Sequence, residues 1–212
     1  MVLGLLAIAA FPTVTGVSLA ASEQRKANQR REDERRMRRF NIDVESAGET
    51  QEDSEVQGKR VVLRDEMIYI DDPDPSNRET PSHTSQAFYV EYPELEHMKH
   101  LGRGLGLVTT VTDSPPLLHW IYADKNTHGL KCGNRTASAE HVVGPWDWAD
   151  DEETITLEEN RKFVAVQEDN RAWVVYFDRD KDDLERVLEE QGKLDNAYAP
   201  IVLKRTMVLQ TA

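Results

Sequence analysis

The sequence predicts a mainly β (α+β) fold: a small antiparallel sheet domain with one or two helices, preceded by an apolar N-terminal helix and a basic helical stalk. Three observations support this prediction. The 212 residues are typical of a single domain. Short runs with alternating apolar and polar residues recur between turn residues, which indicates strands. Finally, charge is unevenly distributed, with an uncharged start, a basic stretch and an acidic remainder.

The apolar start is residues 1–22, which contain no ionisable side chain, although Gly4, Pro12 and Gly16 interrupt the run. About 20 apolar residues are needed to cross a bilayer, so the segment predicts a membrane anchor. An apolar run followed by small residues also fits a cleaved signal peptide. Basic residues follow the run but do not precede it, which predicts a single-pass protein with a cytosolic domain. A secreted protein is the alternative.

The predicted basic helical stalk is residues 23–40. Within it, residues 25–39 hold eight basic and three acidic groups, a net charge of +5. Glu32 and Glu34 precede Arg36 and Arg38 by four residues, a spacing that favours a helix. Beside an anionic leaflet each basic group would add ~1 kcal/mol of attraction. The sequence therefore predicts the membrane as a partner of residues 1–22 and this basic flank.

The acidic remainder, residues 40–212, has a net charge of −17, against −13 for the whole chain. Phosphates require Lys and Arg for neutralisation, so no nucleic-acid partner is expected. Residues 41–57 are acidic and poor in large apolar groups, which predicts a disordered tether. The β-rich domain is therefore predicted at residues 58–212.

The predicted domain is built mainly from short strands. Its clearest element is a hairpin of residues 163–167 and 172–178 around a polar turn. Residues 182–192 predict a helix with Leu184, Val187 and Leu188 on one face. Residues 97–107 predict a short helix that ends in a glycine-rich loop. The other expected strands are residues 60–63, 67–70, 86–93, 117–124, 130–134, 154–159 and 200–209.

Four motifs between Trp120 and Asp183 resemble a family of small fungal proteins. They are a Trp120-x-Tyr122 strand, GNRTAS from Gly133, GPW from Gly144 and YFDRD from Tyr176. The apolar opening also looks like the start of those proteins, and the resemblance covers about half the chain. It implies a fungal source and an apolar N-terminus before a β-rich domain. That family has no established activity, so the resemblance supplies no catalytic residues.

The acidic stretch after the predicted hairpin is the best metal-like pattern. Asp178, Asp180, Asp182 and Glu189 fall at positions 1, 3, 5 and 12 of an EF-hand calcium loop. Position 6 is Asp183, where the loop and the resembling proteins favour Gly, and the segment follows a strand. The alternative is an acidic turn at the start of a helix, where carboxylates are favourable. Calcium is thus the one cofactor that the pattern suggests.

Two further patterns indicate surface chemistry. Asn134 begins an Asn-Arg-Thr sequon, which matters if the domain enters the secretory lumen. Trp146 and Trp148 lie in a predicted turn, where tryptophans either fill the core or form an exposed recognition patch. We expect any ligand or partner surface to lie near these two indoles.

Catalytic patterns are weak. The single cysteine, Cys132, excludes an internal disulfide and is expected to be a small buried thiol. His97 and His100 share a helical spacing but lack an HExxH context, which predicts a surface pair. The glycines at 102, 104 and 106 lack the Lys-Ser/Thr of a P-loop. Whether the protein is an enzyme stays open at this point.

These features predict a noncatalytic, membrane-tethered interaction or accessory protein with an unidentified protein partner. One alternative is a secreted binding protein or effector from which the signal peptide has been removed. Another is an unrecognised enzyme of a specialised fungal pathway that uses His and Asp residues around the sheet.

Overall fold

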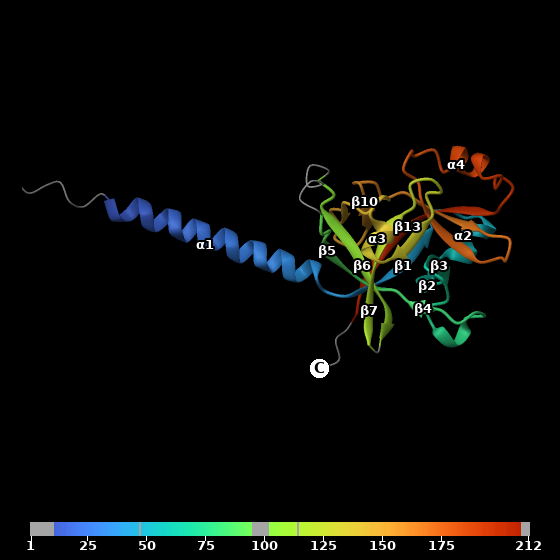
Figure 1. Cartoon of the computed structure of the whole chain (residues 1–212), viewed down its shortest axis with the longest axis horizontal. Coiled ribbons are helices and arrows are strands. Elements are labelled where there is room, and N and C mark those ends of the chain that lie inside the picture. Colours follow the sequence, from blue (N-terminus) through green and yellow to red (C-terminus); the bar gives the residue numbers. More distant parts are fainter. Residues whose placement is uncertain (1–10, 47, 95–101, 114, 209–212) are drawn as a thin grey trace, which may run out of the picture. The chain divides into compact units, whose positions relative to one another are not determined.

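A computed structural model describes residues 11–46, 48–94, 102–113 and 115–208 (Figure 1). The chain divides into two compact units, Met1–Met37 and Arg38–Ala212. The strands are β1 Phe40–Ser46, β2 Arg60–Arg64, β3 Met67–Asp71, β4 His83–Thr84, β5 Gln86–Glu91, β6 Leu105–Asp113, β7 Pro116–Ala123, β8 Leu130–Gly133, β9 Trp146–Trp148, β10 Ile155–Leu157, β11 Phe163–Gln167, β12 Trp173–Phe177 and β13 Tyr198–Met207. The helices are α1 Phe11–Arg36, α2 Gln51–Val56, the 3₁₀ turn η1 Pro75–Asn77, α3 Arg135–Ser138 and α4 Glu185–Glu190.

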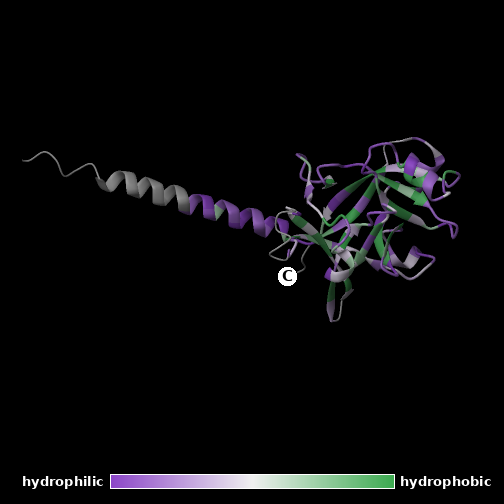
Figure 2. Ribbon diagram, turned by 45° about the horizontal axis from the view of Figure 1, so that its top comes forward, coloured by the Kyte–Doolittle hydropathy of each residue, from purple (hydrophilic) through white to green (hydrophobic). Residues whose placement is uncertain are grey.

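The first unit contains α1, which includes most of the predicted stalk and ends at Arg36. From Glu23 onward most of its side chains are exposed and hydrophilic (Figure 2). Residues 1–10 of the predicted apolar segment lie outside the described residues. None of the helices in the described ranges is long and apolar enough to span a membrane.

The second unit is a closed antiparallel barrel, whereas the sequence predicted a small sheet. Nine strands follow one another in the order β12-β11-β13-β1-β5-β6-β7-β8-β3, and β3 pairs with β12 to close the ring. β2 pairs with both β1 and β3. The hairpin of β11 and β12 forms as predicted. The closing pairs join strands that are far apart in sequence, which local periodicity cannot reveal.

The predicted disordered tether at residues 41–57 is wrong, because most of this segment is ordered. In β1, the alternate residues Phe40, Ile42 and Val44 point into the core of the barrel. β1 pairs with β13 over seven residues. Intervening acidic residues lowered the mean hydropathy and hid this period-2 pattern. α2 then begins at a capping box in which the side chains and backbone of Thr50 and Asp53 bond reciprocally.

The predicted helix and loop at residues 97–107 need a second correction. Residues 95–101, including the paired histidines, lie outside the described ranges, and from Leu105 the chain is strand β6. Gly102 and Gly104 adopt positive φ, a conformation open to glycine. Thr109 and Thr110 are buried in β6, and their polar character weakened the strand signal.

The barrel interior is filled by apolar side chains from nearly every strand. The hydrophobic residues are concentrated in the strands of the barrel (Figure 2). Trp146 is fully buried, and its ring stacks on that of Phe163 with 6.2 Å between centroids. A second cluster lies under α4, where Leu184, Val187 and Leu188 pack on β11 and β12. The apolar face predicted for this helix is therefore its buried face.

Candidate functional site

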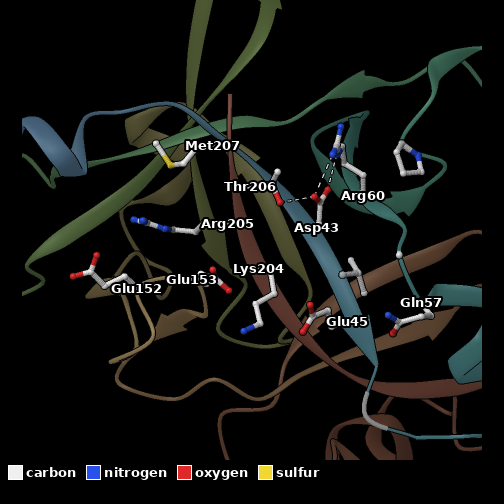
Figure 3. Close-up of a pocket in the computed structure, with 13 residues that line it drawn as sticks. Asp43, Glu45, Gln57, Arg60, Glu152, Glu153, Lys204, Arg205, Thr206 and Met207 are labelled. Atoms are coloured by element: carbon white, nitrogen blue, oxygen red, sulfur yellow. Dashed lines mark hydrogen bonds and ion pairs between the residues drawn. The ribbon is translucent and has the colours of Figure 1, made fainter. Parts of the chain in front are cut away.

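An open pocket of about 550 Å³ lies over the outer face of β1 and β13 (Figure 3). Because Ile42 and Val44 of β1 point into the core, the alternate side chains Asp43 and Glu45 point outward into this pocket. We call it the β1–β13 pocket. It is lined by Asp43, Val44, Glu45, Gln57, Gly58, Arg60, Pro73, Glu152, Glu153, Lys204, Arg205, Thr206 and Met207.

One wall of the pocket is a fixed ion pair. The Arg60 guanidinium donates to both carboxylate oxygens of Asp43, from Nε at 2.6 Å and from Nη2 at 3.1 Å. The Thr206 hydroxyl donates to Asp43 Oδ2 at 2.6 Å. Two-point pairing of this kind fixes the geometry of both side chains. Asp43 is therefore held in place and largely neutralised.

The centre of the pocket is Lys204, which lies between Glu45 and Glu153 (Figure 3). Its ammonium donates to Asp151 Oδ2 at 3.0 Å. This hydrogen bond raises the pKa of Lys204, and the charges of Asp151, Glu45 and Glu153 raise it further. The pKa of Asp151 is lowered, mainly because the Thr154 hydroxyl and backbone N–H donate to it. Three carboxylates thus surround one ammonium, which leaves an excess of negative charge.

The opposite wall connects the pocket to the predicted tryptophan patch. The Arg205 guanidinium lies 4.1 Å from the centroid of the Trp148 ring and 5.2 and 5.8 Å from those of Phe40 and Tyr89. Its Nε is buried and has no hydrogen-bond partner among the described residues. A guanidinium on an aromatic face is attracted by the ring quadrupole.

The two tryptophans predicted as a binding surface have different positions. Trp146 points into the core, and its indole N–H has no hydrogen-bond partner in the described part of the chain. Trp148 is half-buried, is covered by Arg205, and lines a neighbouring pocket of about 510 Å³. Both lie on β9, where alternation directs their neighbour Asp147 away from them.

The predicted calcium ligands are not gathered into one group. No cluster of three or more His, Cys, Asp or Glu suited to a metal occurs in the described ranges. Asp178 is fully buried and accepts backbone N–H groups of Asp182 and Asp183, while Asp180 pairs with Arg186. Asp182 accepts from the Leu184 N–H, and Glu189 is exposed on α4. Asp178 and Asp182 therefore shape the turn before α4.

Asn134 is exposed at the start of α3, where its side-chain oxygen accepts the Ala137 N–H at 3.0 Å. Thr136, the third residue of the sequon, is also exposed. The sequon is therefore accessible on the surface, as a glycosylation site requires.

The single cysteine is buried, as its expected role as a small apolar residue requires. Cys132 is 1% exposed, and this burial raises the pKa of its thiol to about 12. His141 accepts the Lys125 backbone N–H through Nδ1, and its ring stacks on Tyr122. At neutral pH Cys132 is a thiol, which is a poor nucleophile.

Sequence reasoning missed most of the β1–β13 pocket. Asp43 and Glu45 lie in the segment predicted as a disordered tether, and Lys204 and Arg205 lie in the predicted last strand without an assigned role. The alternation of Phe40, Ile42 and Val44 was the available signal for a strand with outward carboxylates.

Comparison with known proteins agrees with this architecture. The family model for the fungal β-trefoil domain matches residues 16–209. No curated protein and no solved structure matches the chain. Since the match covers α1 from residue 16 and the barrel through β13, the chain belongs to the fungal β-trefoil domain family.

Proposed function

We propose that this protein is a noncatalytic interaction protein whose β-trefoil binds a basic segment of a partner polypeptide in the β1–β13 pocket. The observation that carries the proposal is the surplus of carboxylates around Lys204. Four acidic residues and three basic ones line the pocket, and Asp151 adds a further carboxylate. Glu45 and Glu153 are exposed and face Lys204, whose charge is already shared with Asp151.

The character of the pocket supports binding. Its walls are fixed by the Asp43–Arg60 pair and by the Arg205–Trp148 stack, so little side-chain ordering is needed on binding. Guanidinium groups pair with carboxylates through two parallel hydrogen bonds. An arginine-rich segment therefore supplies both the positive charge and the hydrogen-bond donors that the carboxylates of Glu45 and Glu153 can bind.

The noncatalytic part of the proposal rests on the state of the reactive groups. The Cys132 thiol is protonated and buried. In the pocket, Asp43 and Lys204 are occupied by ion pairs with Arg60 and Asp151. A general base must be able to accept a proton, and an ion pair opposes this for Asp43 and Lys204. Both groups are therefore suited to recognition rather than to proton transfer.

The test is binding of fluorescein-labelled octa-arginine to the full chain, measured by anisotropy in 50 mM NaCl. Exposed ion pairs contribute ~0.2–1 kcal/mol each, so Glu45→Gln with Glu153→Gln should weaken binding about 2- to 30-fold. The matched control is Glu189→Gln with Glu190→Gln, which removes the same charge from exposed positions on α4. Equal weakening by both double variants would contradict the proposal, because it would indicate attraction to the acidic domain as a whole.

A second candidate is membrane tethering through residues 1–22 and the basic flank. The supporting observation is the uncharged start followed by eight basic groups in residues 25–39. Flotation of the full chain with neutral phosphatidylcholine vesicles and with vesicles containing phosphatidylserine tests it. Recovery of the chain in the lipid-free fraction in both cases would refute tethering. A glycan on Asn134 and a mature N-terminus near Ser22 would instead support the secreted alternative.

A further inference from the structure

Helix α1 presents basic side chains that the described chain leaves without ion-pair partners. Arg25, Arg30 and Arg31 are exposed and have no ion pair within the described ranges. The pair of Lys26 with Glu23 at 3.4 Å is a weak surface contact. A helix that is polar on every side gains little from packing within its own chain. Arg25, Arg30 and Arg31 are therefore available to a partner with acidic groups.

We propose that the basic segment, residues 25–39, of one copy of this chain docks in the β1–β13 pocket of a second copy. This inference rests on the proposed function and names its partner. Association is then head to tail, since one copy contributes the helix and the next contributes the pocket. Such a contact joins two different surfaces, so repeated docking forms a ring or an open chain of copies.

Charge complementarity supports a second copy as the occupant. The basic segment has a net charge of +5, and residues 40–212 have a net charge of −17. Both surfaces occur once in every copy, so they are always present at equal concentration. No aromatic residue lies among the arginines for stacking on bases, which disfavours a single-stranded nucleic acid as the partner.

The pocket provides the matching groups. Glu45 and Glu153 are exposed at its rim, and Lys204 between them is bonded to Asp151. The planar guanidinium of arginine binds a carboxylate through two hydrogen bonds. It is more weakly hydrated than the ammonium of lysine, so its desolvation on binding costs less free energy. Contacts between exposed charges are screened by salt, which predicts that the association weakens as ionic strength rises.

The experiment is sedimentation velocity of the full chain across a hundredfold concentration range, in 50 mM and 500 mM NaCl. The average mass should rise above 24.2 kDa with concentration in low salt and return to that of a monomer in high salt. Association through the apolar residues 1–22 would show the opposite salt dependence, because excluded salts strengthen hydrophobic contacts. A mass that stays monomeric in low salt would overturn the inference, as would one that rises with salt.

Charge exchange makes the test specific. One variant carries Arg30→Glu with Arg31→Glu, and the other carries Glu45→Arg with Glu153→Arg; circular dichroism checks that both fold. Each variant alone should associate about tenfold or more weakly than the parent chain. An equal mixture should recover association, because each helix then meets a pocket of opposite charge. Failure of the mixture to recover would overturn the inference.

The combined results of these experiments separate this inference from the proposed function. If octa-arginine binds the pocket but the full chain stays monomeric, the proposal that a second copy is the partner fails. The proposal that the β1–β13 pocket binds a basic segment is then still supported. If neither occurs, both proposals fail. Recovery of the monomeric chain on phosphatidylserine vesicles, and loss of that binding in the helix variant, would assign the basic segment to an anionic lipid surface and overturn the inference.

Discussion

Asp53 offers the sharpest test of the fold, because it lies in the segment whose composition predicted disorder. It is 4% exposed. Its carboxylate accepts from the Ser46 hydroxyl, from the Thr50 N–H at 3.0 Å and from the Thr50 hydroxyl at 2.8 Å. The residue therefore joins the end of β1 to the start of α2. Asp53→Ala removes the acceptor in all three bonds.

The expected cost follows from these contacts. Loss of a helix cap costs ~0.5–2 kcal/mol, and hydrogen bonds to a charged group contribute ~1.5–3 kcal/mol each without being additive. We expect Asp53→Ala to lower the free energy of unfolding by about 2–4 kcal/mol. For a chain of this size, 1 kcal/mol corresponds to a shift of ~2–4 °C in melting temperature. The midpoint should therefore fall by about 4–16 °C.

The assays are urea unfolding, which gives the free energy of unfolding, and thermal unfolding, which gives the melting temperature, both followed by tryptophan fluorescence. The control is Glu55→Gln, an exposed position on the same helix, which should change stability by less than ~0.5 kcal/mol. If Asp53→Ala lowered the free energy of unfolding as little as the control does, the reasoning would be refuted. The prediction that residues 41–57 form a disordered tether would then be supported. Hydrogen exchange at Ile42 and Val44 gives an independent measure of whether β1 is protected.

The same residue predicts a pH dependence. The Ser46 hydroxyl, and then Thr50, lower the pKa of Asp53 below its ordinary value, although burial opposes them. Its contribution is therefore complete above the unfolded pKa of ~3.9 and is lost as pH falls through the lower folded pKa. Between pH 5 and pH 2 the parent chain should lose more stability than Asp53→Ala. Parallel acid profiles would contradict this assignment.

Three further predictions concern the core and the pocket wall. Trp146→Ala should cost ~3–5 kcal/mol in urea unfolding, since the indole is fully buried; a loss below ~1 kcal/mol would exclude a core role. Cys132 should resist a thiol reagent at pH 8 in the native chain and react in urea, because burial raises its pKa to about 12; rapid native labelling would contradict that burial. Arg205→Met keeps the apolar stem but removes the charge over Trp148, so it should cost ~0.5–2 kcal/mol and alter Trp148 fluorescence. Unchanged stability and spectrum would show that this stack contributes nothing measurable.

Local patterns predicted the elements whose partners are close in sequence. The hairpin of β11 and β12 combines alternation with a polar turn, and Leu184, Val187 and Leu188 marked the buried face of α4. The closed barrel depends on long-range pairs such as Phe40 with Met207 and Trp173 with Ile70. No local signal specifies those partners, so the ring could not be predicted from periodicity.

The candidate site was harder to predict for a related reason. Trp146 and Trp148 were identified by type, but type alone does not say that Trp146 is fully buried in the core while Trp148 is half-buried under Arg205. Glu45 and Glu153 are 108 positions apart, and they are brought to Lys204 by the pairing of β1 with β13 and by the bridge between Thr154 and Lys204. Composition described the average acidity of the segment, whereas the site depends on which strand face each carboxylate occupies.

The pairing of β1 with β13 also has a consequence for biosynthesis. The first strand of the barrel finds one of its neighbours in the last, so residues 40–197 must be synthesised before that pair can form. Until then β1 exposes one edge, with Phe40, Ile42 and Val44 on a single face, during translation. The nascent chain is therefore most exposed to misassociation just before its final ten-residue strand leaves the ribosome. A stop codon in place of Tyr198, which deletes β13, should yield a product that depends on chaperones and is quickly degraded.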